Sequence, residues 1–128
     1  DLPIASIHRS KFAAYDEYHT SLDNLETVVT PLGLDGGYWA LRRAIEALEN
    51  NSFYNTSVFC EPQMGRRGLY QKDNPNVLTK NSKLTMDFLS YCDGQLDLLQ
   101  IADILDVPIW ELYDIKRLLL DYELIYEL

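Results

Sequence analysis

A histidine and an aspartate lie four residues apart in a polar, aromatic stretch near the start of the chain, Tyr18–Asp23. Zinc in proteins takes imidazole nitrogens, and neighbouring polar groups fix the orientation of each ligand. This pattern makes His19 a candidate metal ligand, with Tyr18 and Asp23 as candidates for holding its ring in place. The alternative is a loop in which the same groups make a structural hydrogen bond, and the spacing alone favours that alternative.

A second candidate is a basic loop, in which Arg66 and Arg67 lie between two glycines. Glycines beside guanidinium groups can present backbone N–H groups and positive charge to an anion. The spacing is not that of a phosphate-binding P-loop, which needs Gly-Lys-Ser/Thr after four intervening residues. The alternative is that both arginines pair with acidic groups of the flanking segments, and the abundance of acids favours it.

A third candidate is an apolar and aromatic surface formed by Ile109, Trp110 and Tyr113. Tryptophan and tyrosine often anchor protein interfaces. We expect these three side chains to point outward from a helix and to contact a partner. The alternative is that Trp110 folds back onto the 53–70 segment of the same chain.

The third candidate belongs to a pattern of helices that fills the C-terminal part of the chain. Helical spacing and turn residues predict a helix ending at Asp93-Gly94, a second helix capped by Asp97, a break at Asp106–Pro108, a third helix and a closing strand over Leu124–Leu128. The expected inward residues are Leu84, Phe88, Leu89 and Cys92, then Leu98, Ile101, Ala102 and Leu105, then Leu112, Ile115, Leu119 and Tyr122. This order resembles a winged helix-turn-helix.

Charge argues against the DNA binding for which that motif is known. Residues 81–128 contain three basic residues, Lys83, Lys116 and Arg117, against ten acidic ones. Affinity for DNA comes largely from Lys and Arg neutralising phosphates, and base reading favours Arg, Lys, Asn or Gln. Glu123 also occupies the place where such folds usually carry a glycine. We therefore expect this unit to contact protein rather than nucleic acid.

The N-terminal part has weaker signals. Pro3–Arg9 predicts a short buried strand, residues 10–23 a long loop, and Leu25–Val29 a turn of helix or a short strand. An amphipathic helix is predicted from about Tyr38 to Asn50, with its inner residues at Leu41, Ala44, Ile45 and Leu48. Ser57–Cys60 is a further candidate strand, and residues 71–82 are typical of an exposed linker.

Composition bounds the remaining choices. With 128 residues and 47% hydrophobic content, the chain can form one ordinary domain or two small ones. The net charge of −9 disfavours nucleic acid and anionic membranes as partners, and no apolar run approaches a membrane span. Two cysteines without metal-type spacing, Cys60 and Cys92, indicate buried reduced thiols in a cytoplasmic protein. The start at Asp1, with neither a Met nor a signal peptide, suggests a piece of a longer protein.

The segment from Tyr18 to Asn24 resembles the last metal-ligand segment of bimetallic zinc aminopeptidases, a His-Thr-x-x-Asp pattern. Four further segments resemble a bacterial aminopeptidase-like family with a C-terminal winged helix, often linked to polysaccharide biosynthesis: Leu2–Ile4, Ser6–Ser10, Cys60–Gln63 and Arg67–Tyr70. The resemblance covers nearly the whole chain. It implies that His19 is a zinc ligand, whereas His8 matches no ligand.

The resemblance implies an α+β chain: the end of an α/β zinc-aminopeptidase-like domain over 1–52, a joint and linker over 53–80, and a winged helix-turn-helix over 81–128. A two-zinc site needs about five protein ligands, and the resemblance places the others before Asp1. We therefore expect zinc in the intact parent protein, and neither metal nor catalysis in this chain alone.

The expected function is that of a contact or scaffolding module. Its expected partners are the upstream peptidase domain and possibly another protein or a second copy. The alternatives are a DNA-binding regulator and a peptide-binding winged helix.

Overall fold

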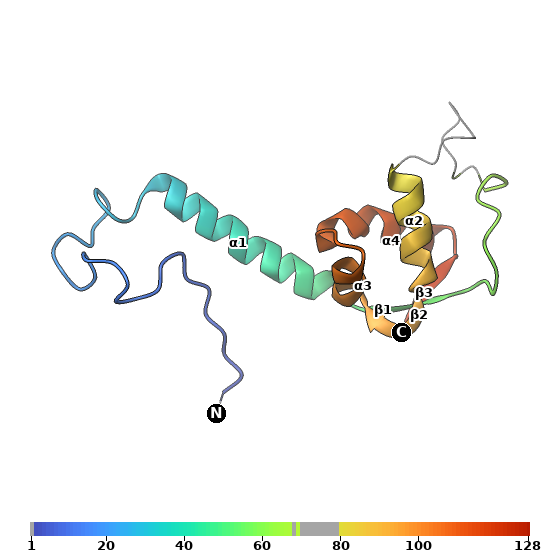
Figure 1. Ribbon diagram of the computed structural model, residues 1–128, viewed down its shortest axis with the longest axis horizontal. Coiled ribbons are helices and arrows are strands. Elements are labelled where there is room, and N and C mark those ends of the chain that lie inside the picture. The colour runs from blue at the N-terminus through green and yellow to red at the C-terminus, as the bar shows by residue number, and fades with distance from the viewer. Residues whose placement is uncertain (1, 68, 70–79) are drawn as a thin grey trace. The chain divides into compact units, whose positions relative to one another are not determined.

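The computed structural model describes residues 2–67, 69 and 80–128 (Figure 1). The chain divides into two units, one reaching from Asp1 to Glu46 and the other from Ala47 to Leu128. Within the described residues, no helix combines the length and the apolarity that crossing a bilayer requires. Each unit is described by itself below.

The first unit consists of loop, turns and most of one helix. The strand predicted at Pro3–Arg9 is wrong, because this segment is exposed and has no regular structure. A strand needs a neighbour with which to exchange backbone hydrogen bonds, and the described residues of this unit contain no other strand. The loop predicted over residues 10–23 is confirmed, and Leu25–Val29 forms a turn.

Helix α1 spans Pro31–Asn50 and therefore begins seven residues before the predicted start at Tyr38. The Thr30 hydroxyl accepts a hydrogen bond from the Gly33 backbone N–H at 3.1 Å, which caps the first turn. Pro31 follows the cap in the position where a proline costs the helix no hydrogen bond. A good N-terminus thus outweighs the three glycines, which lie inside the helix and which we had interpreted as punctuation.

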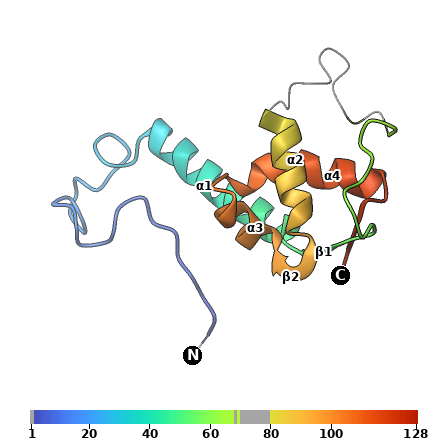
Figure 2. The same ribbon diagram turned by 45° about the vertical axis from the view of Figure 1, so that its right-hand side comes forward.

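The second unit contains the predicted winged helix. After the last turn of α1 its elements are strand β1 Phe53–Thr56, helix α2 Lys80–Ser90, strand β2 Asp93–Asp97, helix α3 Leu98–Ile104, the 3-10 helix η1 Ile109–Leu112, helix α4 Tyr113–Asp121 and strand β3 Ile125–Glu127. Helices α2, α3 and α4 lie on one side of the small sheet (Figures 1 and 2). This arrangement confirms the predicted fold class.

The sheet is antiparallel, with the order β2-β1-β3, so its central strand comes from before the three helices. Tyr54 lies opposite Glu127, and Phe53 lies opposite Asp97. The strand predicted at Ser57–Cys60 is wrong, since β1 ends at Thr56. β2 was not predicted at all, because Asp93-Gly94 looked like a plain turn between helices. Gly94 does adopt the expected left-handed conformation, with a φ of 77°.

The core of this unit is built mainly from the predicted inward residues. The largest fully buried side chains are Tyr54, Phe88, Leu98, Ile101, Leu112, Leu119 and Leu124. Leu84, Leu105 and Ile115 are half-buried and pack against this cluster. Tyr122 was predicted to face inward and is 40% exposed, because α4 ends at Asp121 and Tyr122 already forms its C-terminal cap.

The predicted corners of the winged helix are confirmed. Asp97 accepts a hydrogen bond from the Gln100 backbone N–H at 2.8 Å, while the Gln100 side chain accepts one from the Asp97 backbone N–H at 2.9 Å. This reciprocal pair is a capping box, which satisfies two donors at the start of α3. Asp106 and Glu123 have φ values of 53° and 52°. Glu123 thus adopts the left-handed conformation that favours the glycine usual at that place.

The segment that follows α1 is hydrogen-bonded into the winged helix at three consecutive residues. Asn50 accepts from the Lys116 ammonium at 3.0 Å, and Asn51 accepts from the Leu99 backbone N–H at 2.9 Å. The Ser52 carbonyl accepts from the Leu98 backbone N–H at 3.0 Å. The second unit therefore begins with the last turn of α1.

Candidate functional site

The candidate metal segment holds one exposed imidazole. The His19 ring stacks on the Tyr18 ring, with centroids 4.3 Å apart and planes 26° from parallel. Asp23 accepts a hydrogen bond from the Tyr15 hydroxyl at 3.1 Å, so its carboxylate is engaged by a tyrosine. Within the described residues, no three His, Cys, Asp or Glu side chains converge as a metal would require.

A zinc site takes three or four protein ligands. The side chains around His19 therefore do not fit a zinc ion by themselves. The arrangement of Tyr18, His19 and Asp23 is what a structural loop needs, and no reaction step follows from it.

The basic loop is a turn over residues 64–67 in which Arg66 and Arg67 are exposed. Both arginines line one shallow pocket together with Phe59, Cys60, Glu61 and Gln63. The carboxylate of Glu61 shares this pocket with the two guanidinium groups, so an anion there would meet a like charge. The pocket therefore offers an anion no preorganised site.

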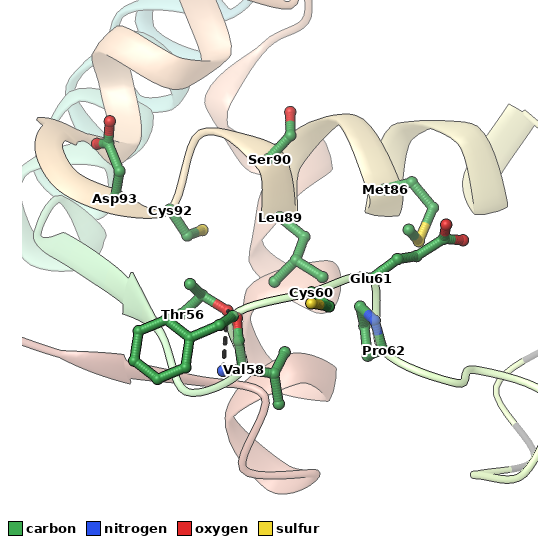
Figure 3. A pocket seen from close by; sticks show the side chains of 11 residues that line it. Thr56, Val58, Cys60, Glu61, Pro62, Met86, Leu89, Ser90, Cys92 and Asp93 are labelled. Atoms are coloured by element: carbon green, nitrogen blue, oxygen red, sulfur yellow. Dashed lines mark hydrogen bonds between the residues drawn. The ribbon is translucent and has the colours of Figure 1, made fainter.

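A second pocket, of about 390 Å³, lies between the 58–62 segment and α2 (Figure 3). Leu89, Met86 and Val58 give it an apolar lining, and both cysteines border it. The thiol of Cys92 contacts the Phe88 carbonyl at 3.4 Å, and burial raises its pKa to about 12. A thiol so protonated is a poor nucleophile. Cys60 is exposed, so the expectation of two buried thiols is wrong for Cys60, while both remain free as expected.

The predicted contact surface is only partly assembled. Ile109 is 6% exposed and belongs to the core, which contradicts its predicted outward position. The reason is helical geometry: residues three apart eclipse in a 3-10 helix, so Ile109 lies on the same face as the buried Leu112. Trp110 is 45% exposed, and Tyr113 is half-buried.

Lys116, in the middle of α4, points toward the interior. Its ammonium donates to Asn50 and lies 5.8 Å from the ring centroids of both Tyr54 and Tyr113. Loss of hydration lowers the pKa of this ammonium. A cation held between an amide and two aromatic rings is stabilised by cation–π attraction. It is not displayed for a phosphate.

The sequence carries a signal for this inward lysine that we did not use. Lys116 follows Leu112 by four residues and precedes Leu119 by three, so it lies on the stripe that α4 turns to the core. By contrast, Arg117 is 73% exposed and only 3.7 Å from Asp114, which is 94% exposed. An ion pair so exposed contributes little. Arg117 is thus the one basic residue that α4 turns to solvent.

Comparison with known proteins separates the same two parts. A family model described as winged helix-turn-helix matches residues 51–127, and one described as a domain of unknown function matches residues 1–51. A Clostridium acetobutylicum protein named "Putative polysaccharide biosynthesis protein with aminopeptidase-like domain" is 36% identical over 104 residues. That match spans 80% of this chain and 24% of the relative.

A solved structure agrees with the sequence match. The crystal structure of a "putative peptidase" from Clostridium acetobutylicum superposes with a TM-score of 0.76 at 28% identity, covering 91% of this chain and 25% of that one. The winged-helix model matches more than half of the chain. The chain thus belongs to the winged helix-turn-helix family and is similar, over most of its length, to about a quarter of an aminopeptidase-like protein.

Proposed function

We propose that the winged helix serves as a protein-contact module of an aminopeptidase-like protein and does not read duplex DNA. The observation that carries this proposal is the inward position of Lys116. A winged helix normally presents its third helix to the major groove. Here the central cation of that helix is bonded to Asn50 at 3.0 Å, so the helix spends its main phosphate ligand on its own fold.

The charge of the unit supports the same conclusion. With Lys116 engaged, Lys83 on α2 and Arg117 on α4 are the other basic residues of the 81–128 segment, against ten acids. Exposed acids on α4 include Asp114 and Asp121. DNA affinity rises with the number of phosphates that a protein neutralises. Repulsion within a Debye length of about 8 Å at physiological salt would oppose even a transient encounter.

Exposed apolar side chains supply the composition of a protein contact. Trp110 is 45%, Leu118 37% and Tyr122 40% exposed, all on η1 and α4 or at the end of α4. Interface cores are enriched in aromatic residues and depleted of Lys, Glu and Asp. The contact would therefore centre on these three side chains, with the surrounding acids at its polar rim.

The relatives give the contact its setting. One is named for polysaccharide biosynthesis and an aminopeptidase-like domain, and another is described as a peptidase. We place the chain in a protein of that kind. Any zinc-dependent peptidase chemistry would rest on ligands supplied by other parts of such a protein, because the described residues here do not make a metal site.

DNA binding is the second candidate, because the winged helix-turn-helix match is itself an observation in its favour. The two candidates separate in a fluorescence-anisotropy titration of the chain against a labelled mixed-sequence duplex, at low salt and at about 0.15 M salt. We expect no binding at the higher salt.

Charge-reversal variants locate any binding that does occur. Arg117→Glu removes the exposed base of α4, and Lys83→Glu makes the same change of charge on α2. Micromolar, salt-sensitive binding that Arg117→Glu abolishes and Lys83→Glu leaves intact would show α4 reading DNA and would overturn the proposal.

A further inference from the structure

Helix α1 carries a row of large apolar side chains that nothing covers. The row follows the spacing four, three, four, three along the helix, which places its members on one face. Their exposed fractions lie between 50% and 77%: Leu34, Tyr38, Leu41, Ile45 and Leu48.

A second row of small residues runs beside the first, because each member directly precedes a large one: Gly33, Gly37, Ala40, Ala44 and Ala47. Of these, Ala47 packs against the core of the second unit. Together the two rows make roughly half of the helix circumference apolar. The charged residues, including Arg42 and Glu46, which pair at 2.7 Å, lie on the other half.

The whole first unit shares this lack of cover. Among its described residues, 2–46, not one is buried. Leu2, Ile4 and Phe12 are 79%, 75% and 57% exposed. Soluble monomers rarely leave such extended apolar surface in water. This unit therefore has the composition of a core without the partner that would complete it.

The width of the apolar face identifies the kind of partner. A two-stranded coiled coil uses a narrow seam, with charged residues along both flanks. Here one flank of the large row is formed by Gly37 and Ala44, which have no charge to pair with a second copy. A wide face with a small-residue flank suits close packing against a broad apolar layer, as in a globular domain.

We propose that this face of α1 docks onto the remainder of the aminopeptidase-like domain that the longer relatives carry. Two observations favour this occupant over a second copy of the chain. The family model for residues 1–51 ends where α1 ends. The matched part is only 24% of the Clostridium acetobutylicum relative, so most of that protein lies outside the match. This proposal does not depend on whether the winged helix binds DNA.

The test is co-purification. The tagged 128-residue chain is co-expressed with the part of the Clostridium acetobutylicum protein outside the matched segment. We expect the chain to retain that part, and the double variant Leu41→Glu with Ile45→Glu to lose it. Arg43→Glu on the charged face alters the net charge by the same two units and should retain it.

Sedimentation of the chain alone completes the test, and circular dichroism confirms that each variant keeps its helical content. We expect a concentration-dependent, non-stoichiometric association through the bare face, or a monomer. Failure of the wild-type chain to retain the remainder, or equal loss in the Arg43→Glu control, would overturn the proposal. So would a stable dimer that the Leu41→Glu, Ile45→Glu variant dissociates, because that result assigns the face to a second copy.

Discussion

Replacing Leu119 by alanine should lower the free energy of unfolding of the winged helix by roughly 2–5 kcal/mol, as large-to-small changes in a packed core do. Leu119 is 0% exposed and lies in α4 between the sheet and the other helices. The loss combines the transfer free energy of the missing atoms with that of the cavity left behind. Urea unfolding followed by far-UV circular dichroism measures it.

The adjacent leucine provides the control. Leu118 lies in the same helix and is 37% exposed, so Leu118→Ala makes the same change in helix propensity while removing far less buried surface. We expect that variant to lose less than about 1 kcal/mol. Equal losses at the two positions would mean that α4 faces the core with a different side.

Replacing Tyr54 by alanine should cost about 3–5 kcal/mol, the range for removing a buried aromatic ring. Tyr54 is 1% exposed, in the central strand of the sheet. Its burial raises the pKa of its hydroxyl to about 12, and the Lys116 ammonium lies 5.8 Å from its ring. The variant therefore removes a wall of the core and one side of the lysine's surroundings together. Thermal and urea unfolding both report the loss.

Phe53 is the matched position on the opposite face of the same strand, and it is 43% exposed. Phe53→Ala should cost less than half as much, since strand propensity and partial packing account for only about 1 kcal/mol. A small effect of Tyr54→Ala would show that β1 is a dispensable joint, as its place before the three helices first suggested.

The winged helix was predictable because its signals are local. Helical spacing, the cap at Asp97, the break at Pro108 and the apolar strand after Leu124 each lie within a few residues of the element they define. Its sheet was not predictable in the same way. β1 pairs with β3 across about seventy residues, as Thr56 opposite Ile125 shows, and no local pattern records such a partner.

The errors at the candidate contact surface have one geometric cause. Assuming a regular helix from Ile109 places that residue outward, whereas a 3-10 turn brings it under the core. The inward turn of Lys116 was missed for a different reason. A charged side chain on an apolar stripe is normally expected to extend to water, and only Asn50 and the two tyrosine rings make its inward position favourable.

The N-terminal part was misjudged where its structure depends on absent neighbours. Periodicity alone predicted a buried strand at Pro3–Arg9 and an inner face on α1. The spacing of Leu41, Ile45 and Leu48 is as predicted, but these residues are exposed, because nothing in the described residues lies against them.

Hydrogen–deuterium exchange on the isolated chain tests most directly the claim that the winged helix folds by itself while the N-terminal part requires a partner. We expect slow, cooperative exchange in β1, α3, α4 and β3, whose side chains form the core. We expect fast exchange up to Glu46, because a helix with no buried face is marginal in water. Protection of α1 equal to that of α4 in the monomeric chain would contradict this account.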